Sequence, residues 1–184
     1  MTPGFQLRLA AEKLRQGAVV AWPTEAVFGI GCDPLNPQAI ARLLKIKQRP
    51  LSKGLILIAA DFSQLHPYVE PLPAEQMNKV LASWPGPYTW LLPASVYTPD
   101  WITGGSELVA VRITAHPVAR ALCQSFGGAL TSTSANRSGQ RPALNALQVP
   151  LRCPGVENIL HGATGSLLQP TPIRNALSSE VIRP

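Results

Sequence analysis

The sequence predicts a single α/β domain. Two patterns lead to this fold class: segments with apolar residues at helical spacing alternate with short, continuously apolar runs of strand length. The length of 184 residues suits one domain, and no repeat, linker or low-complexity tract interrupts the alternation. We therefore expect one domain over residues 1–184.

The first elements are a helix, a strand and a second helix. A helix is expected over residues 5–16, where apolar residues lie three or four apart and Gly17 follows as a C-terminal cap. Residues 18–22 form an apolar run of strand formers that stops at Pro23. An Asn-Pro pair then predicts a helix over residues 37–47.

Strands dominate the middle of the chain. Residues 54–60 are continuously apolar, as expected of a strand that is buried on both faces. After a helix over residues 73–83, further strands are expected at 88–93 and 108–113. Because side chains alternate along a strand, Arg112 should lie on the face opposite to the valines of its strand.

The last third continues the alternation. Pro117 opens a helix, and residues 128–135 begin as a strand and end in hydroxyl side chains. Short strands near 156–160 and within 171–183 complete the chain.

The basic residues gather in two segments that contain no acid. The chain has 16 Lys and Arg against 10 Asp and Glu, a formal net charge of +6. Ten of the sixteen fall in residues 34–60 and 108–156: Arg42, Lys45, Lys47, Arg49, Lys53, Arg112, Arg120, Arg137, Arg141 and Arg152. The excess favours anionic partners, although a solvated basic face is the simpler reading.

Cysteine and apolar content point to the cytoplasm. The three cysteines are far apart and form no C-x-x-C pair, a poor basis for disulfides or a zinc site. The three histidines lack ligand spacing, so we expect no protein-bound metal. The N-terminus does not resemble a secretory signal, and no apolar run approaches the ~18 residues of a membrane span.

The first segment with functional chemistry is PTEAVFGIGCDP, residues 23–34. It is expected to be a loop after a buried strand, which is where open α/β sheets place ligand groups. Thr24 and Glu25 supply a hydroxyl and a carboxylate, and Gly29 and Gly31 permit close backbone approach or a positive φ. The alternative is an ordinary turn.

The second segment is KIKQRPLSKG, residues 45–54. If the chain is extended before Pro50, Lys47 and Arg49 project in the same direction, because extended residues alternate sides. Two cations aimed at one point suit a polyphosphate. A solvated basic loop is the alternative.

The third segment is LTSTSANRSGQRP, residues 130–142. Six hydroxyl or amide side chains fall within eight positions: Thr131, Ser132, Thr133, Ser134, Asn136 and Ser138. Such density at a strand end suits recognition of phosphate, carboxylate or ribose. The P-loop pattern is absent from the chain, and a self-capped polar turn is the alternative.

Six segments occur in an order that resembles the YrdC/TsaC family: PTEAVFGIGCDP, KQRP with KGLILIAA, WPGPYTWLLP, VAVRI with HP, TSTSANRSGQRP and QPTPIRNA. The resemblance spans nearly the whole chain and is strongest to the short bacterial members, which lack an extra C-terminal domain. It implies a twisted mixed sheet around a large basic cavity. It also implies a nucleotidyltransferase that joins L-threonine, bicarbonate or CO2, and ATP into L-threonylcarbamoyladenylate and releases pyrophosphate.

The resemblance also implies roles for individual residues. Lys47 and Arg49 match a K-x-R motif and are expected to hold the ATP phosphates without a covalent intermediate, while Ser134 belongs to an S-x-N motif. Arg112 is the expected partner of the threonine carboxylate. The implied ATP-binding residues are Lys45, Lys47, Arg49, Ser134, Asn136, Arg141 and Arg183, with Lys53 as supporting charge. The implied threonine-binding residues are Thr24, Arg112, Ser132 and Thr171.

Three positions depart from the family pattern. Ala26 stands where a second threonine is usual, Phe28 where a tyrosine is usual, and Asn175 where an aspartate is common. Hydroxyls at the first two positions are therefore not required here, and a catalytic carboxylate is not expected at Asn175.

The expected partners follow from the implied reaction. Mg2+ would accompany ATP, and the product would pass to a separate threonylcarbamoyl transferase complex that modifies position 37 of tRNAs. Weak tRNA binding is compatible with the charge. The rival hypotheses are a double-stranded RNA or tRNA-binding module, and a carbamoyl-transfer domain like that of hydrogenase-maturation proteins, whose additional cysteines this chain lacks.

Overall fold

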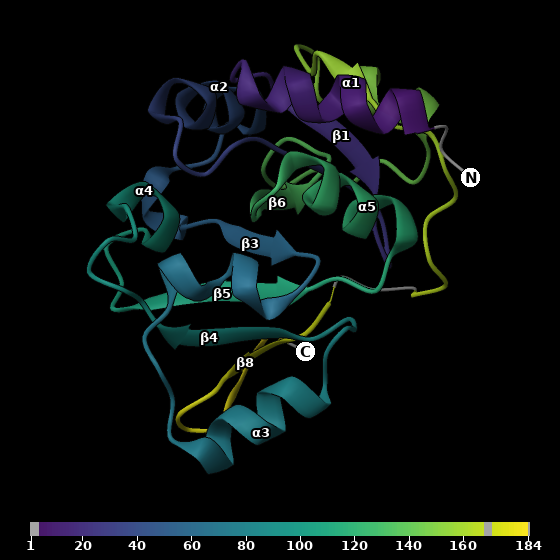
Figure 1. Cartoon of the computed structure of the whole chain (residues 1–184). Helices are drawn as coiled ribbons and strands as arrows, with labels where there is room; N and C mark the ends of the chain where they lie inside the picture. Colours follow the sequence, from purple (N-terminus) through teal and green to yellow (C-terminus); the bar gives the residue numbers. More distant parts are fainter. Residues whose placement is uncertain (1–3, 168–170, 184) are drawn as a thin grey trace.

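The computed structural model describes residues 4–167 and 171–183. Its α-helices are α1 Gly4–Arg15, α2 Pro37–Lys47, α3 Ala74–Ala82, α4 Asp100–Thr103, α5 Pro117–Phe126 and α6 Val149–Arg152. Its strands are β1 Val20–Pro23, β2 Phe28–Gly31, β3 Ile56–Ala59, β4 Thr89–Pro93, β5 Leu108–Ile113, β6 Leu130–Ser134, β7 Asn158–Ile159, β8 Ile173–Asn175 and β9 Val181–Arg183. The predicted α/β class is confirmed (Figure 1).

The strands form one mixed sheet in the order β7-β1-β2-β6-β3-β5-β4-β8-β9. The pairs β1–β7, β3–β5 and β4–β8 are parallel, and the other neighbours are antiparallel. β3 lies inside the sheet, with Leu57 opposite Val111 of β5 on one side and Thr131 of β6 on the other. The mixed sheet with flanking helices is therefore as expected.

Helices cover both faces of this sheet. On one face, Leu14 of α1 and Leu122 of α5 pack with Trp22 of β1. On the other face, Leu43 of α2 packs in a cluster that includes Ala21 of β1. Consecutive residues of β1 thus enter opposite apolar layers, which explains why its sequence is continuously apolar rather than alternating.

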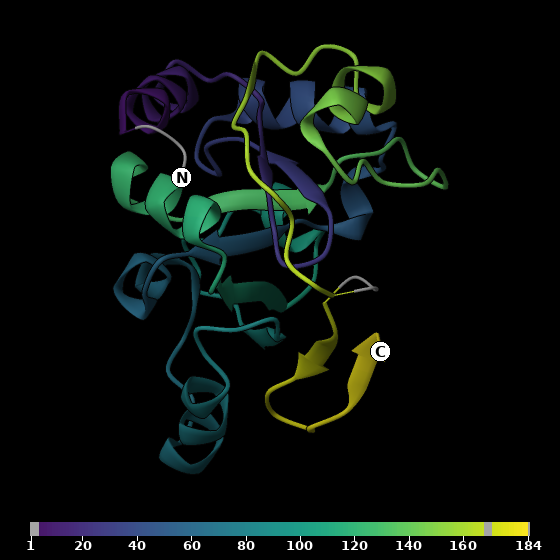
Figure 2. The same cartoon turned by 90° about the vertical axis from the view of Figure 1, so that its right-hand side faces the viewer.

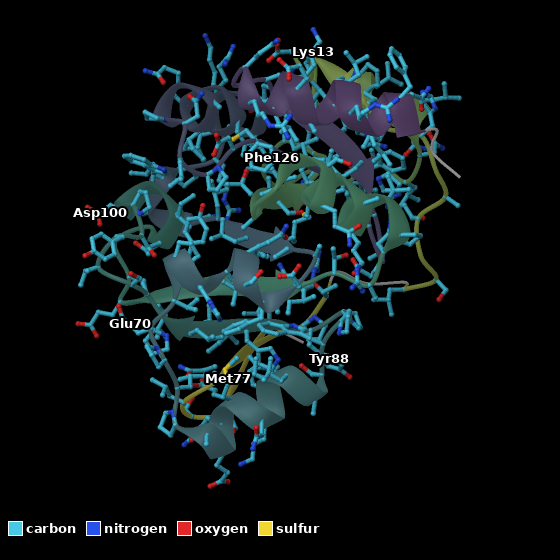
Figure 3. All side chains as sticks on the ribbon, viewed as in Figure 1. Lys13, Glu70, Met77, Tyr88, Asp100 and Phe126 are labelled. Atoms are coloured by element: carbon cyan, nitrogen blue, oxygen red, sulfur yellow. The ribbon has the colours of Figure 1, made fainter. Side chains whose placement is uncertain are left out.

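The helices α1 and α5 lie on the same side of the sheet (Figure 2). Phe126, labelled in Figure 3, ends α5 next to α1, and the guanidinium of Arg15 lies 5.9 Å from the centroid of its ring. Arg15 also donates to the carbonyl of Ser125 at 2.7 Å. Two segments more than a hundred residues apart are joined in this way.

The expectation of a loop over residues 23–34 was partly wrong. β2 lies within this segment and pairs with β1, with Val20 opposite Gly31, so the segment is irregular only at residues 24–27 and 32–34. Gly31 is needed for close approach, because a Cβ there would lie 1.7 Å from the carbonyl oxygen of Thr131. A short strand that carries two glycines has a weak strand signal, and its pairing with β1 and β6 compensates for it.

The expected extended conformation at Lys47 was also wrong. Lys47 is the last residue of α2, and Gln48 follows in the left-handed region with φ of 49°. The backbone N–H of Gln48 donates to the carbonyls at the end of the helix, so the cap of the helix fixes where the Lys47 side chain starts. Lys47 and Arg49 therefore leave the backbone in different local geometries.

Candidate active site

A pocket of about 440 Å³ opens on the face of the sheet that α1 and α5 cover. Its base comes from four adjacent strands, through Ser132 of β6, Ile56 of β3, Ala110 of β5 and Leu91 of β4. Along β6, Leu130 packs in the apolar layer under α5, whereas Ser132 and Ser134 lie in the pocket. Along β6, therefore, the pocket begins where apolar residues give way to hydroxyls.

Three arginines line the pocket, and they come from distant parts of the chain. Arg49 follows α2, Arg112 lies on β5 and Arg183 ends β9. Lys53 adds a fourth positive charge, and no acid lines the pocket among the residues that the structure describes. The two acid-free segments of the sequence thus supply three of these four cations.

Burial and mutual repulsion act on these charges. Burial lowers the pKa of Arg49, and burial together with the charges of Arg112 and Arg49 lowers the pKa of Arg183. Arg49 donates to backbone carbonyls, through Nε and Nη2 to Gly54 at 3.2 and 3.0 Å. Guanidinium groups that repel one another and are partly dehydrated favour an anionic ligand between them.

Arg112 is the most deeply buried of the three, at 5% exposed. Its Nη1 donates to the hydroxyl of Thr171 at 2.6 Å, and its Nη2 lies 3.6 Å from Oε2 of Glu25. Its buried Nε has no hydrogen-bond partner among the residues that the structure describes. Burial lowers the pKa of Arg112 and the charge of Glu25 opposes that shift. The predicted orientation of Arg112, away from the valines of β5, is confirmed.

Thr171 connects two of the arginines. Its hydroxyl accepts from Arg112, its backbone carbonyl accepts from Nη2 of Arg183 at 2.7 Å, and its hydroxyl lies 3.4 Å from that of Thr89. Thr24, which also lines the pocket, donates to the carbonyl of Val27 at 2.7 Å. The Thr24 oxygen can then only accept, which suits an ammonium or hydroxyl group. The Thr171 hydroxyl and the arginine N–H groups can donate, which suits carboxylate and phosphate oxygens.

Lys47 does not line this pocket, although it is the central cation of the second sequence segment. It is 3% exposed, and its ammonium donates to the carbonyl of Ser134 and, at 2.8 Å, to the carbonyl of Asn136. Burial lowers its pKa to about 8, a shift that the nearby positive charge of Arg49 increases and Cys153 opposes. Lys47 thus binds backbone carbonyls at the end of β6 and stabilises that end without lining the pocket.

Three further expected residues lie outside the pocket lining. Asn136 is buried in the turn after β6 and donates through Nδ2 to the carbonyls of Arg137 and Gln140 at 2.8 and 2.7 Å. Lys45 on α2 and Arg141 are exposed. The pocket therefore brings together Thr24, Arg49, Arg112, Ser132, Ser134, Thr171 and Arg183, and it does not include Lys45, Lys47, Asn136 or Arg141.

One residue next to the pocket, Glu25, was noted in the sequence for its carboxylate but was given no role there. Glu25 is buried behind Thr24 and accepts from the hydroxyl of Thr114 at 2.6 Å and from the backbone N–H of Ala115 at 3.1 Å. Burial raises its pKa, but Arg112, Thr114 and backbone donors outweigh this effect, so the pKa lies below its ordinary value. The available signal was that Glu25 is the one acid between residues 13 and 32.

Metal ligands do not gather in the described part of the chain. No three His, Cys, Asp or Glu side chains within residues 4–167 and 171–183 lie close enough together to hold a metal ion. Over the same ranges, no helix is long and apolar enough to cross a membrane.

The model of the Sua5/YciO/YrdC family, described as "Telomere recombination", matches residues 12–184. The chain belongs to this family. The family member from Halorhodospira halophila is named threonylcarbamoyl-AMP synthase, and it is 55% identical over 184 residues, covering 99% of this chain and 96% of the relative. A relative of the same name from Alkalilimnicola ehrlichii is 57% identical over 187 residues, covering 99% and 97%.

Solved structures of family members have the same fold. P. abyssi Sua5 complexed with L-threonine superposes with a TM-score of 0.91 at 33% identity. The match covers 98% of this chain and 54% of the Sua5 chain, so this chain spans about half the length of that relative. E. coli YciO superposes with a TM-score of 0.80 at 25% identity, covering 96% and 87%.

Proposed function

We propose that this chain is a threonylcarbamoyl-AMP synthase, which converts L-threonine, bicarbonate or CO2, and ATP into L-threonylcarbamoyladenylate and pyrophosphate. The observation that carries this proposal is the pocket of three arginines and several hydroxyls, in a chain more than half identical to relatives of that name. Such a site can neutralise a triphosphate, a carbamate and an amino-acid carboxylate together.

The proposed threonine subsite lies around Arg112. Its guanidinium lines the pocket and would bind the substrate carboxylate. The hydroxyls of Thr24, Ser132 and Thr171 surround the same space and would orient the amino acid.

The proposed phosphate subsite lies around Arg49 and Arg183, with Ser134 at the end of β6. Lys47 and Asn136 would support this subsite by holding the β6 end and its turn, because their polar groups contact one another there rather than the pocket. Lys45 and Arg141 lie farther out, where they would add only long-range charge.

The chemistry needs no covalent enzyme intermediate. The amine of threonine adds to CO2 with loss of a proton, or to bicarbonate with loss of water, to give N-carboxythreonine. A carbamate oxygen of this species then attacks the α-phosphorus of ATP, a new P–O bond forms, and the bond from the α-phosphorus to the bridging β-phosphate oxygen breaks to release pyrophosphate. The arginines would neutralise the charge that moves onto the leaving group, and the pocket would hold the reactants in line. Mg2+ would arrive with ATP, with phosphate oxygens and water as its ligands, since the described lining offers no carboxylate.

The product and its users form part of the same proposal. The adenylate would pass in the cytoplasm to a separate transferase complex that forms N6-threonylcarbamoyladenosine at position 37 of tRNAs reading codons that begin with A. Weak tRNA binding through exposed cations such as Lys45 and Arg141 would have an affinity that falls steeply with salt.

Incubation of the protein with L-threonine, bicarbonate and MgATP tests the proposal. We expect pyrophosphate release that depends on threonine and bicarbonate, together with an adenylate adduct that mass spectrometry detects. Reactions without threonine, and with L-serine in its place, are the controls. Pyrophosphate release that is the same with and without threonine would refute the proposed function.

A further inference from the structure

Glu25 is a buried acid beside a pocket whose charged lining residues, in the described part of the chain, are all cations. It lies in the turn between β1 and β2, between two pocket-lining residues, Thr24 and Ala26. It is 8% exposed and itself does not line the pocket. A buried carboxylate costs free energy unless it is paired, so its partners indicate what it does.

The two oxygens of Glu25 have different surroundings. Oε1 is held by two donors at the start of the segment after β5, the hydroxyl of Thr114 and the backbone N–H of Ala115. Oε2 is buried, lies 3.6 Å from Nη2 of Arg112, and has no hydrogen bond among residues 4–167 and 171–183. One oxygen thus anchors the carboxylate, and the other directs its charge at the arginine.

The backbone of Glu25 is fixed as well. Its carbonyl accepts from the N–H of Leu167 at 3.2 Å, and the carbonyl of Thr24 accepts from the N–H of Gly165 at 2.9 Å. A Cβ at Gly165 would lie 2.4 Å from the carbonyl oxygen of Glu25, so this crossing segment packs directly on the turn. The carboxylate therefore has little freedom to move away from Arg112.

We propose that Glu25 is a positioning residue for threonine recognition: it holds the guanidinium of Arg112 in the orientation in which that group receives the substrate carboxylate. Thr171 holds Arg112 from the other side, through the 2.6 Å bond to Nη1. The inference rests on the proposed function, because it assigns Arg112 to the threonine carboxylate.

A positioning role for Glu25 and a purely electrostatic role predict opposite changes in threonine affinity when the charge of Glu25 is removed. Without that charge the pocket becomes more positive, so long-range electrostatics alone would tighten the binding of an anionic amino-acid carboxylate. If Glu25 acts by holding Arg112, the guanidinium loses one of its two restraints and threonine binds more weakly. ATP binding, which the proposed function assigns to Arg49 and Arg183, should be unchanged if Glu25 acts only by holding Arg112.

The substitution Glu25→Gln tests this, because it removes the charge and keeps an oxygen for Thr114 and Ala115. We expect the KM for threonine to rise about tenfold or more, with the KM for ATP within about twofold of wild type. Glu25→Asp, which restores the charge, should recover part of the threonine affinity. Glu70→Gln is the matched control, since Glu70 is an exposed acid outside this pocket.

A second variant keeps the inference testable if Glu25→Gln fails to fold. Thr114→Val removes one of the two donors that anchor the carboxylate, and it should raise the KM for threonine by a smaller factor, about threefold, without changing the KM for ATP. Calorimetric titration with L-threonine alone gives the same comparison without turnover.

The outcomes separate the inference from the proposed function. A KM for threonine that is unchanged or lower in Glu25→Gln and Thr114→Val, with wild type active, would overturn the positioning role alone. Equal increases in both substrates' KM values would also overturn it, because they indicate general damage to the pocket. A wild-type protein that binds no threonine would count against the proposed function, and the inference would fall with it.

Discussion

Replacement of Lys47 by methionine should destabilise the protein although Lys47 lies outside the pocket. Methionine has a similar length and fills the same space, but it cannot donate. The change leaves the carbonyls of Ser134 and Asn136 without the ammonium that they share at the end of β6. Because Ser134 lines the pocket, the end of β6 should also become less ordered where the phosphates are proposed to bind.

The size of the loss follows from these contacts. A hydrogen bond to a charged group contributes about 1.5–3 kcal/mol, and Lys47 makes two, to the part-buried carbonyl of Ser134 and the buried carbonyl of Asn136. The cost of burying the ammonium, visible in its pKa of about 8, offsets part of this gain. The two bonds together contribute about 3–6 kcal/mol, and the lowering of the pKa from 10.5 to about 8 offsets about 3 kcal/mol of this. We therefore expect a loss of about 1–3 kcal/mol in the free energy of unfolding, or roughly 2–12 °C in Tm for a chain of this length.

Urea unfolding followed by tryptophan fluorescence measures this loss. Lys45→Met is the matched control, because Lys45 is exposed on the same helix and should change stability by less than about 0.5 kcal/mol. If Lys47→Met unfolds within that margin of Lys45→Met, the bonds from Lys47 to the β6 end do not stabilise the fold, and the reasoning is wrong.

Three further predictions concern the phosphate subsite, the sheet and the pH dependence. Arg49→Ala should weaken ATP binding by about 1.5–3 kcal/mol in calorimetry and leave threonine binding unchanged; equal ATP affinity would remove Arg49 from the phosphate subsite. Gly31→Ala should cost more than about 2 kcal/mol, because its Cβ would meet the Thr131 carbonyl, whereas Gly128→Ala, with only ordinary contacts, should cost much less; similar Tm values would contradict this. Lys47 has a pKa of about 8 in the folded chain against 10.5 as its ordinary value, so between these pH values the unfolded state binds the extra proton and stability should rise with pH. Below about pH 8 this contribution is constant, and a Lys47→Met variant that shows the same rise would exclude Lys47 as its source.

Much of the fold could be predicted because its signals are local. The helices α1, α2 and α5 each have apolar residues at helical spacing and begin or end at recognisable glycine or proline residues. The side of β5 on which Arg112 lies followed from strand alternation alone. The short helices α4 and α6 were missed because four residues contain barely one helical turn and therefore no period.

The site could be predicted only in part because its contacts are not local. Seven of the eleven implied residues meet in the pocket, and these seven come from segments near both ends and the middle of the chain. The pairing of Glu25 with Arg112 joins positions 87 residues apart, and no spacing rule connects them. The directions of Lys47 and Arg49 relative to each other depend on Gln48, which lies between them in the left-handed region. This conformation is uncommon for residues other than glycine, so the sequence does not predict it.

The placement of β8 beside β4, with β9 paired to β8, affects how the site forms during synthesis. Thr171 and Arg183 leave the ribosome after the strands β1 to β7 have been made. Until then the nascent chain can build the sheet and its two apolar layers, but Arg112 has Glu25 without Thr171, and the wall that Arg183 supplies is missing. A translation product that stops before Thr171 would therefore keep most of the core and lack a complete substrate pocket.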